Sequence, residues 1–257
     1  MADGRRLELL AFDGDASRPT IVMLHEGLGS VSTWRDFPAR VSQAAGSSVL
    51  VYSRYGHGAS DRLAQARRAD FMHHEAEIVL PELLERLRIE RPILLGHSDG
   101  GSIALIYAAM PTTAPRGLIL EAPHVFVEEM TVRSIAKIRE VYASTDLRTK
   151  LARHHAHVDE TFRGWNDIWL NPEFRKWNIE DRLAGVRCPV QVIQGVDDEY
   201  GTMEQVAAIR RGVTQVPVET LLLPECGHSP HRDRGEQTLE AIVEFVGRIG
   251  SRSVQRF

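Results

Sequence analysis

Short apolar runs alternate along this chain with longer stretches in which apolar residues recur at helical spacing. The runs are bounded by glycine, proline or charged residues, which is typical of buried strands. They predict strands at 7–12, 20–24, 49–52, 93–96, 117–121, 189–194 and 218–223. The intervening stretches predict helices at about 34–45, 70–87, 103–110, 203–212 and 237–249. Because strands and helices alternate, we expect an α/β fold with a mostly parallel central sheet covered on both faces.

The alternation stops after the strand at 117–121. Residues 124–187 show helical periodicity and no convincing strand, with helices expected near 129–142, 146–161 and 172–184. We therefore predict a core domain made of residues 1–123 and 188–257, and a helical cap made of residues 124–187.

Composition narrows the class of protein. The chain has 257 residues, of which 43% are apolar, and a net charge of −4. This size fits one soluble domain with an insertion. Basic and acidic residues are interspersed, and no apolar run approaches the ~20 residues of a membrane helix, so we expect neither a nucleic-acid nor a membrane partner. The two cysteines form no metal or redox motif, which favours a reducing compartment, the cytoplasm.

The candidate nucleophile is Ser98, in the pattern Gly-x-Ser-x-Gly formed by residues 96–100. An apolar run precedes it and a helical stretch follows it. A serine on a sharp strand-to-helix turn is exposed at the end of the sheet, and glycines on either side leave room for the turn. The helix that follows points its free N–H groups at the same place.

A serine hydroxyl needs a base, and the base needs an orienting acid. His228 is the candidate base, because it follows an apolar strand and precedes the last helix; His231 is its nearest rival. The acid is expected in Asp197-Asp198, which follows the strand at 189–194, and Glu121 is a more distant candidate.

Taken together, these features resemble the cap-bearing α/β-hydrolase family with a serine nucleophile and a Ser-Asp-His triad. The resemblance rests on Gly-His-Ser-Asp-Gly-Gly at 96–101, on the order of nucleophile, acid and base, and on the turn at 53–60, which has Ser53 where the family usually has Asp. Gly195-Val196-Asp197-Asp198 matches the family's Gly-x-x-Asp acid turn, which favours Asp198. The match covers nearly the whole chain except 124–187, and it implies catalytic residues Ser98, Asp198 and His228.

Two backbone amides should stabilise the oxyanion. One is that of Asp99, the residue after the nucleophile, and the other belongs to the loop at 25–30. Where the family usually has His-Gly, this chain has His-Glu26. Alignment on the Gly-Ser at 29–30 makes Gly27 the donor, with Leu28 as second choice. We expect Glu26 to have a structural role rather than to face the pocket.

The predicted activity is hydrolysis of a small-molecule carboxylic ester through an acyl-enzyme on Ser98, as in the carboxylic ester hydrolases (EC 3.1.1), without cofactor or metal. The resemblance leaves alternatives open: the same triad cleaves carbon–carbon bonds in ring-cleavage diketones, opens lactones or cleaves amides. A different class, a non-catalytic receptor for a small ligand, is also found on related folds. A serine nucleophile argues against haloalkane dehalogenase and epoxide hydrolase activity, where the family uses Asp.

The cap is expected to set specificity. Candidate substrate contacts are Leu28, His124, Trp165 and Trp169, and Trp177 is a further candidate for a pocket wall. Histidines at 154, 155 and 157 are interpreted as a surface strip of a helix, since no carboxylate or cysteine completes a metal site. A homodimer is possible, but the sequence does not determine the oligomeric state.

Overall fold

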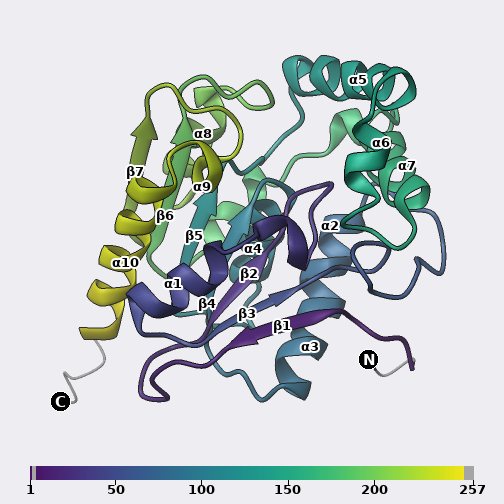
Figure 1. Ribbon diagram of the computed structural model, residues 1–257. Helices are drawn as coiled ribbons and strands as arrows, with labels where there is room; N and C mark the ends of the chain where they lie inside the picture. Colours follow the sequence, from purple (N-terminus) through teal and green to yellow (C-terminus); the bar gives the residue numbers. More distant parts are fainter. Residues whose placement is uncertain (2–3, 252–257) are drawn as a thin grey trace.

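The computed structural model describes residues 1 and 4–251 and contains a seven-stranded sheet in the order β1-β3-β2-β4-β5-β6-β7 (Figure 1). The edge strand β1 runs antiparallel to β3, and the other pairs are parallel. The strands are β1 (Leu9–Phe12), β2 (Ile21–Leu24), β3 (Val49–Tyr52), β4 (Ile93–His97), β5 (Gly117–Glu121), β6 (Val190–Gly195) and β7 (Val218–Leu223). The α/β fold class predicted from the alternation is therefore confirmed.

Helices cover both faces of the sheet, which explains why the inner strands β2 to β6 are buried at every position. On β2, Ile21 and Met23 pack against one group of helices, whereas Val22 and Leu24 pack against the other. The first group contains α1 (Phe37–Ala45) and α10 (Gly235–Ser251), preceded in the chain by the turns η1 (Val31–Trp34) and α9 (Pro230–Asp233). The second contains α2 (Phe71–His74), η2 (Glu75–Val79), α3 (Leu80–Arg86), α4 (Asp99–Ala109) and α8 (Met203–Gly212).

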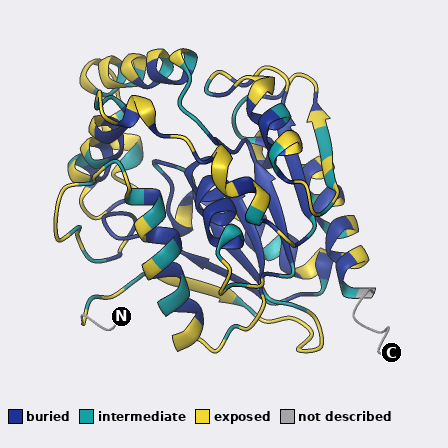
Figure 2. Ribbon diagram, turned by 180° about the vertical axis from the view of Figure 1, so that it is seen from behind, coloured by how far each residue is buried: buried dark blue, intermediate teal, exposed yellow. Residues whose placement is uncertain are grey.

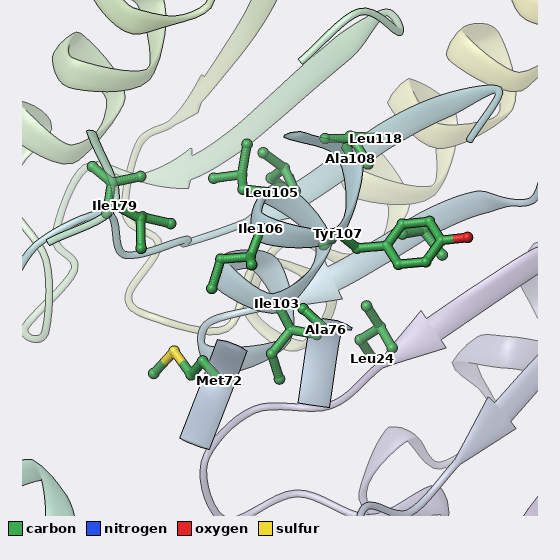
Figure 3. Packing of buried hydrophobic residues seen from close by; sticks show 14 of the residues in the cluster. Leu24, Met72, Ala76, Ile103, Leu105, Ile106, Tyr107, Ala108, Leu118 and Ile179 are labelled. Carbon is green, nitrogen blue, oxygen red and sulfur yellow. The ribbon is translucent and has the colours of Figure 1, made fainter. Parts of the chain in front are cut away.

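The helix α4 is buried over almost its whole length. Figure 2 shows the central strands and α4 as the most buried part of the chain, and Figure 3 shows Ile103 of α4 beside Met72 and Ala76. Because α4 is apolar around its circumference, it is also packed by α2, η2 and the turn at Glu180–Gly185. Ser98, at the start of α4, is thereby attached to one of the most buried parts of the fold.

Residues 124–187, called the cap segment below, lie between β5 and β6. They form α5 (Glu129–Ser144), α6 (Leu147–Leu151), α7 (Val158–Trp169) and the short 3-10 turns η3 (Phe174–Lys176) and η4 (Glu180–Gly185). Figure 1 shows α5, α6 and α7 gathered at one side of the sheet, and all three contact one another.

Two of the helices predicted in the cap segment are not continuous helices in the structure. The expected helix at 146–161 is divided into α6 and α7, because the connection at 152–157 bonds to the core instead of continuing the helix. The expected helix at 172–184 consists only of η3 and η4. None of the helices in the described part of the chain is long and apolar enough to span a membrane.

Candidate active site

Ser98 occupies the sharp turn between β4 and α4. Its backbone has φ 54° and ψ −117°, a conformation that residues with a Cβ rarely adopt. The two flanking glycines are required by close packing. A Cβ on Gly96 would lie 2.3 Å from the carbonyl oxygen of Gly100, and one on Gly100 would lie 2.0 Å from the carbonyl oxygen of Leu24. The turn therefore fits only with glycine at both positions.

The structure brings Ser98, His228 and Asp198 together at the carboxyl ends of β4, β6 and β7. His228 Nε2 lies 2.8 Å from Ser98 Oγ, and His228 Nδ1 lies 2.9 Å from both carboxylate oxygens of Asp198. This geometry fits a hydroxyl that donates to Nε2 and an Nδ1–H that donates to the carboxylate. Asp198 also accepts from Gln194 Nε2 at 2.6 Å and from the Tyr200 N–H at 2.8 Å, so its orientation is fixed.

The surroundings of His228 and Asp198 favour the charged form of each side chain. Burial acts to lower the pKa of His228, but the charge and hydrogen bond of Asp198 outweigh it, so this pKa lies above its usual value. Burial acts to raise the pKa of Asp198, but His228 and the Tyr200 N–H outweigh it, so this pKa lies below its usual value. An imidazolium formed on His228 is therefore stabilised.

The rival candidates from the sequence pair with each other. His231 Nδ1 lies 2.7 Å from Glu121 Oε2, and both side chains are buried. His97 lies between the rings of His228 and His231, and its Nε2–H donates to the carbonyl oxygen of His228 at 2.6 Å. Burial and the neighbouring histidines hold the pKa of His97 well below its usual value, so it is neutral. Asp197 is exposed.

In the loop after β2, the Leu28 N–H donates to the carboxylate of Glu26 and is not available to a substrate. Gly27 is different, since its amide makes no hydrogen bond within residues 4–251. The amide of Asp99 stands at the first position of α4, where helices leave the N–H unpaired. The two candidate oxyanion donors, Gly27 and Asp99, are thus the free amides, and Leu28, the second choice, is engaged.

Glu26 has the structural role that we expected, but it also faces the pocket, which we did not expect. Its carboxylate bonds within the loop, and its side chain also lines the cavity above Ser98. Burial raises the pKa of this carboxyl above its usual value. A group that tends toward its neutral form opposes a nearby oxyanion less than a fixed carboxylate would.

The sequence reasoning missed Arg54, which holds the candidate oxyanion loop. Its Nη1 donates to the carbonyl oxygen of His25 at 2.5 Å and its Nη2 to that of Glu26 at 3.0 Å. The same Nη2 lies 3.6 Å from Asp99 Oδ2, and Asp99 accepts from Trp169 Nε1 at 3.2 Å. One buried guanidinium therefore joins the loop after β2 to the residue after Ser98.

Glu8 supplies the carboxylate that is missing from the turn at 53–60. Ser53, which replaces the usual Asp, donates from Oγ to Glu8 Oε2 at 2.6 Å and accepts from the Val31 N–H at 2.8 Å. The same Glu8 oxygen accepts from the Ala59 N–H at 3.0 Å. The departure of Ser53 from the family pattern is thus balanced by an acid that lies forty-five residues away in sequence.

A cavity of about 450 Å³ lies above Ser98 and His228. All four candidate substrate contacts line it: Leu28, His124, Trp165 and Trp169. Trp177 does not, and lines a separate surface groove instead. Burial and the charge of His228 lower the pKa of His124 to about 3, so it is neutral beside the triad. Another cavity, of about 490 Å³, is lined by Arg54, Arg67 and Phe71 among others, and by none of the triad.

The histidines of the cap segment do not form a helical surface strip, and that interpretation was wrong. His155 is buried in the connection between α6 and α7. Its Nδ1 accepts from the Gly58 N–H at 3.0 Å, and its Nε2–H donates to the carbonyl oxygen of Leu28 at 2.8 Å. Burial lowers the pKa of His155 to about 4. A neutral histidine therefore fastens the cap segment to the candidate oxyanion loop.

Comparisons with known proteins agree with this architecture. The profile of the alpha/beta hydrolase family matches residues 21–241. A 2-hydroxy-6-oxononadienedioate/2-hydroxy-6-oxononatrienedioate hydrolase of Cupriavidus pinatubonensis is 24% identical, covering 91% of this chain and 89% of its own. The sn-1-specific diacylglycerol lipase ABHD11 of Xenopus laevis is 25% identical, covering 91% and 82%.

Solved structures show the same fold. MGS-M2, an alpha/beta hydrolase enzyme from a Medee basin deep-sea metagenome library, has a TM-score of 0.75 at 19% identity, covering 95% of this chain and 94% of its own. The enol-lactonase from Burkholderia xenovorans LB400 has a TM-score of 0.74 at 20% identity, covering 95% and 98%. At these sequence identities the similarity shows a shared fold and nothing further.

Proposed function

Because the chain belongs to the alpha/beta hydrolase family, we propose that it is a serine hydrolase that cleaves a small-molecule carboxylic ester through an acyl-enzyme on Ser98. The observation that carries the proposal is the continuous series of hydrogen bonds from Ser98 Oγ through His228 to Asp198. It lies at the base of a cavity with two free amides at its edge.

Acylation follows from this geometry. Ser98 Oγ attacks the ester carbonyl while its proton passes to His228 Nε2, and Asp198 stabilises the imidazolium that forms. The carbonyl oxygen becomes an oxyanion that accepts from the Gly27 and Asp99 amides, each worth about 3 kcal/mol of barrier. His228 then protonates the leaving alkoxide, and the alcohol departs.

Deacylation uses the same groups in reverse. His228, now neutral, takes a proton from a water molecule that attacks the acyl carbonyl, and returns it to Ser98 Oγ as the acid leaves. Each step is performed by groups of this chain, so the proposal includes no metal or organic cofactor.

We assign substrate selection to residues 124–187, as a cap over the core formed by 1–123 and 188–257. Trp165 and Trp169 bring indole rings from α7 into the cavity, Leu28 lines it from the core, and His124 lines it from the first position of the cap segment. An apolar wall beside a polar reaction centre is typical of small-molecule sites. We expect an acyl chain to lie against the two indole rings.

Carbon–carbon bond hydrolysis is the second candidate, and the relative from Cupriavidus pinatubonensis favours it. The triad is the same, but the leaving group is a carbon acid instead of an alcohol. Lactone and amide hydrolysis would also use these residues. A receptor that binds a ligand without turning it over is the candidate from another class.

Hydrolysis of 4-nitrophenyl esters from acetate to octanoate, with Ser98→Ala as the control, tests the proposal. We expect multiple turnovers, and a loss of about 10⁴- to 10⁶-fold in kcat in the variant. A ring-cleavage 2-hydroxy-6-oxodienoate is assayed in parallel. Turnover of that compound alone would replace the ester proposal with the carbon–carbon one, whereas binding of both compounds without turnover would favour a receptor.

The proposed setting is the cytoplasm, with a small-molecule acyl compound as the partner. Cys188 and Cys226 are both buried and unpaired, which fits a reducing compartment. Fractionation of the native host checks the location, and size-exclusion chromatography checks whether the chain forms a homodimer.

A further inference from the structure

The mouth of the cavity above Ser98 carries a group of basic side chains from separate elements. Arg35 follows η1, Arg232 belongs to α9, and Lys150 and His154 come from the cap segment; all four line the cavity. We call these four residues the basic cluster. Core and cap therefore contribute cations to the same opening, although they are far apart in sequence.

The two arginines of the cluster lack an acidic partner among the residues described. Arginines elsewhere on the surface form ion pairs, for example Arg40 with Glu236 and Arg148 with Asp159. The guanidinium of Arg232 donates from Nη2 to the carbonyl oxygen of Thr33 at 3.1 Å, and to no carboxylate among the described residues. These two guanidiniums line the cavity above Ser98 and have no carboxylate partner among the described residues, so they leave a site for an anion from outside.

The surroundings of His154 show how close these cations are to one another. Burial and then the charges of Arg232, Arg35 and Arg153 lower the pKa of His154 below its usual value. Lys150 is partly neutralised by Asp146, at 3.0 Å.

Two acids also line the cavity, and neither forms an ion pair with Arg35 or Arg232 among the described residues. Glu26 accepts from the Leu28 N–H; that bond and the charge of Arg232 act to lower its pKa, but burial outweighs them and raises this pKa above its usual value. Glu199 belongs to the loop after β6, next to the acid of the triad. The opening is therefore positive on the side of Arg35 and Arg232.

The backbone at Arg35 lies in the region that favours glycine. Arg35 has φ 56° and ψ −126°, nearly the conformation of Ser98 at φ 54° and ψ −117°. Glycine adopts such angles without strain, whereas a residue with a Cβ is held there by its surroundings. Arg88 and Arg91, which do not line the cavity, also have a positive φ. The conformation is useful here because Arg35→Gly can remove the charge without straining the backbone.

We propose that the basic cluster binds a carboxylate of the substrate remote from the scissile bond, with Arg35 and Arg232 as its main donors. Guanidinium–carboxylate pairs are bidentate and directional, so they select for the charge and for its distance from the reacting carbonyl. The substrates are then half-esters of dicarboxylic acids. This inference rests on the proposed esterase function and specifies its substrate class.

The kinetic test compares 4-nitrophenyl hydrogen adipate, pimelate and suberate with the hexanoate, heptanoate and octanoate esters, in which a methyl group replaces the distal carboxylate. For the wild-type protein we expect kcat/KM to be about 10- to 100-fold higher for the best carboxylated ester than for its neutral match. The preference should weaken at 0.5 M NaCl, because the cluster is open to solvent. Equal kcat/KM values for every matched pair would overturn the inference.

Arg35→Gly separates the role of the side chain from that of the backbone. The variant removes the charge but suits φ 56°, so we expect a higher melting temperature together with a carboxylate preference reduced about tenfold. Arg35→Lys keeps the charge and should retain most of the preference, whereas Arg210→Gln, which replaces an exposed arginine outside the cavity, should leave it unchanged. An unchanged preference in both Arg35→Gly and Arg232→Gln would contradict the assignment.

A binding measurement keeps the inference distinct from the proposed function. Calorimetric titration of Ser98→Ala with monomethyl adipate and with methyl hexanoate needs no turnover. Tighter binding of the carboxylated ester supports the basic cluster even if no ester is hydrolysed, in which case only the esterase proposal fails. Equal affinities contradict the cluster even if ester hydrolysis is fast.

Discussion

Replacing His155 with glutamine should make the protein less stable at neutral pH but affect it little at pH 5. The imidazole accepts from the Gly58 N–H and donates to the carbonyl oxygen of Leu28, and both bonds require its neutral form. Glutamine can replace only one of them. At pH 8 we therefore expect a cost of about 1–3 kcal/mol, the penalty for leaving a buried polar group unsatisfied.

The effect of pH follows from the pKa of His155, which burial lowers from 6.5 to about 4. Between these values the unfolded chain binds a proton that the folded chain does not, so stability falls as the pH is lowered. At pH 5 this histidine alone lowers the free energy of unfolding of the wild type by about 2 kcal/mol relative to pH 8, from 1.36 kcal/mol per pKa unit. The glutamine variant does not have this loss, so its cost shrinks by the same amount.

Urea unfolding followed by tryptophan fluorescence at pH 5, 6, 7 and 8 measures this difference. Protonation of the other buried histidines cancels between wild type and variant. His157→Gln, at an exposed position of the same connection, is the matched control and should cost much less than His155→Gln at pH 8, because an exposed side chain remains hydrated when the protein folds. A cost of His155→Gln that is equal at pH 5 and pH 8 would refute the reasoning.

Three further predictions concern the proposed active site. Gly27→Ala should lower kcat by about 10²- to 10³-fold, since the new Cβ would lie 2.0 Å from Trp165 Nε1 and would shift an oxyanion donor; ester kinetics on the folded variant checks it. Because Asp198 raises the pKa of His228 above 6.5, the kcat/KM of the wild type should fall as the pH drops through that ionisation. In a pH–rate profile, Asp198→Asn should move the ionisation to lower pH. Gly100→Ala should lower the melting temperature, because its Cβ would lie 2.0 Å from the carbonyl oxygen that ends β2, and a thermal scan that matches the wild type would contradict the packing.

The strands and the turn at Ser98 could be predicted from sequence because each is fixed by local chemistry. A run such as 93–95 is apolar at every position and is bounded by Pro92 and Gly96, so few alternatives fit it. The glycines at 96 and 100 likewise follow from close contacts within the turn itself. Chain order and strand ends then indicated which acid and histidine meet Ser98.

The connection between α6 and α7 could not be predicted, because its form depends on distant partners. Residues 152–157 have helical composition, yet the chain leaves the helix so that the Ala156 N–H can donate to the Gly58 carbonyl and His155 can reach Leu28. Tertiary hydrogen bonds here outweigh a helix propensity of a few tenths of a kcal/mol per residue.

Glu8 and Arg54 were missed for a related reason. Their partners are the turn at 53–60 and the loop after β2, and no local motif links an acid ahead of β1 with that turn. A partial signal existed in Ser53: when a carboxylate expected in a tight turn is absent, another acid is needed to bond the turn's free N–H groups.

The bond from His155 to Leu28 also bears on how substrate reaches Ser98. The carbonyl that accepts this bond belongs to the residue after Gly27, whose amide is a proposed oxyanion donor. A movement that swings α6 and α7 outward must break that bond and free the loop that carries the donor. The loop after β2 would then be either open to incoming substrate or ordered for reaction, but not both at once. Such an arrangement would favour hydrolysis only after the cap segment has closed over its ligand.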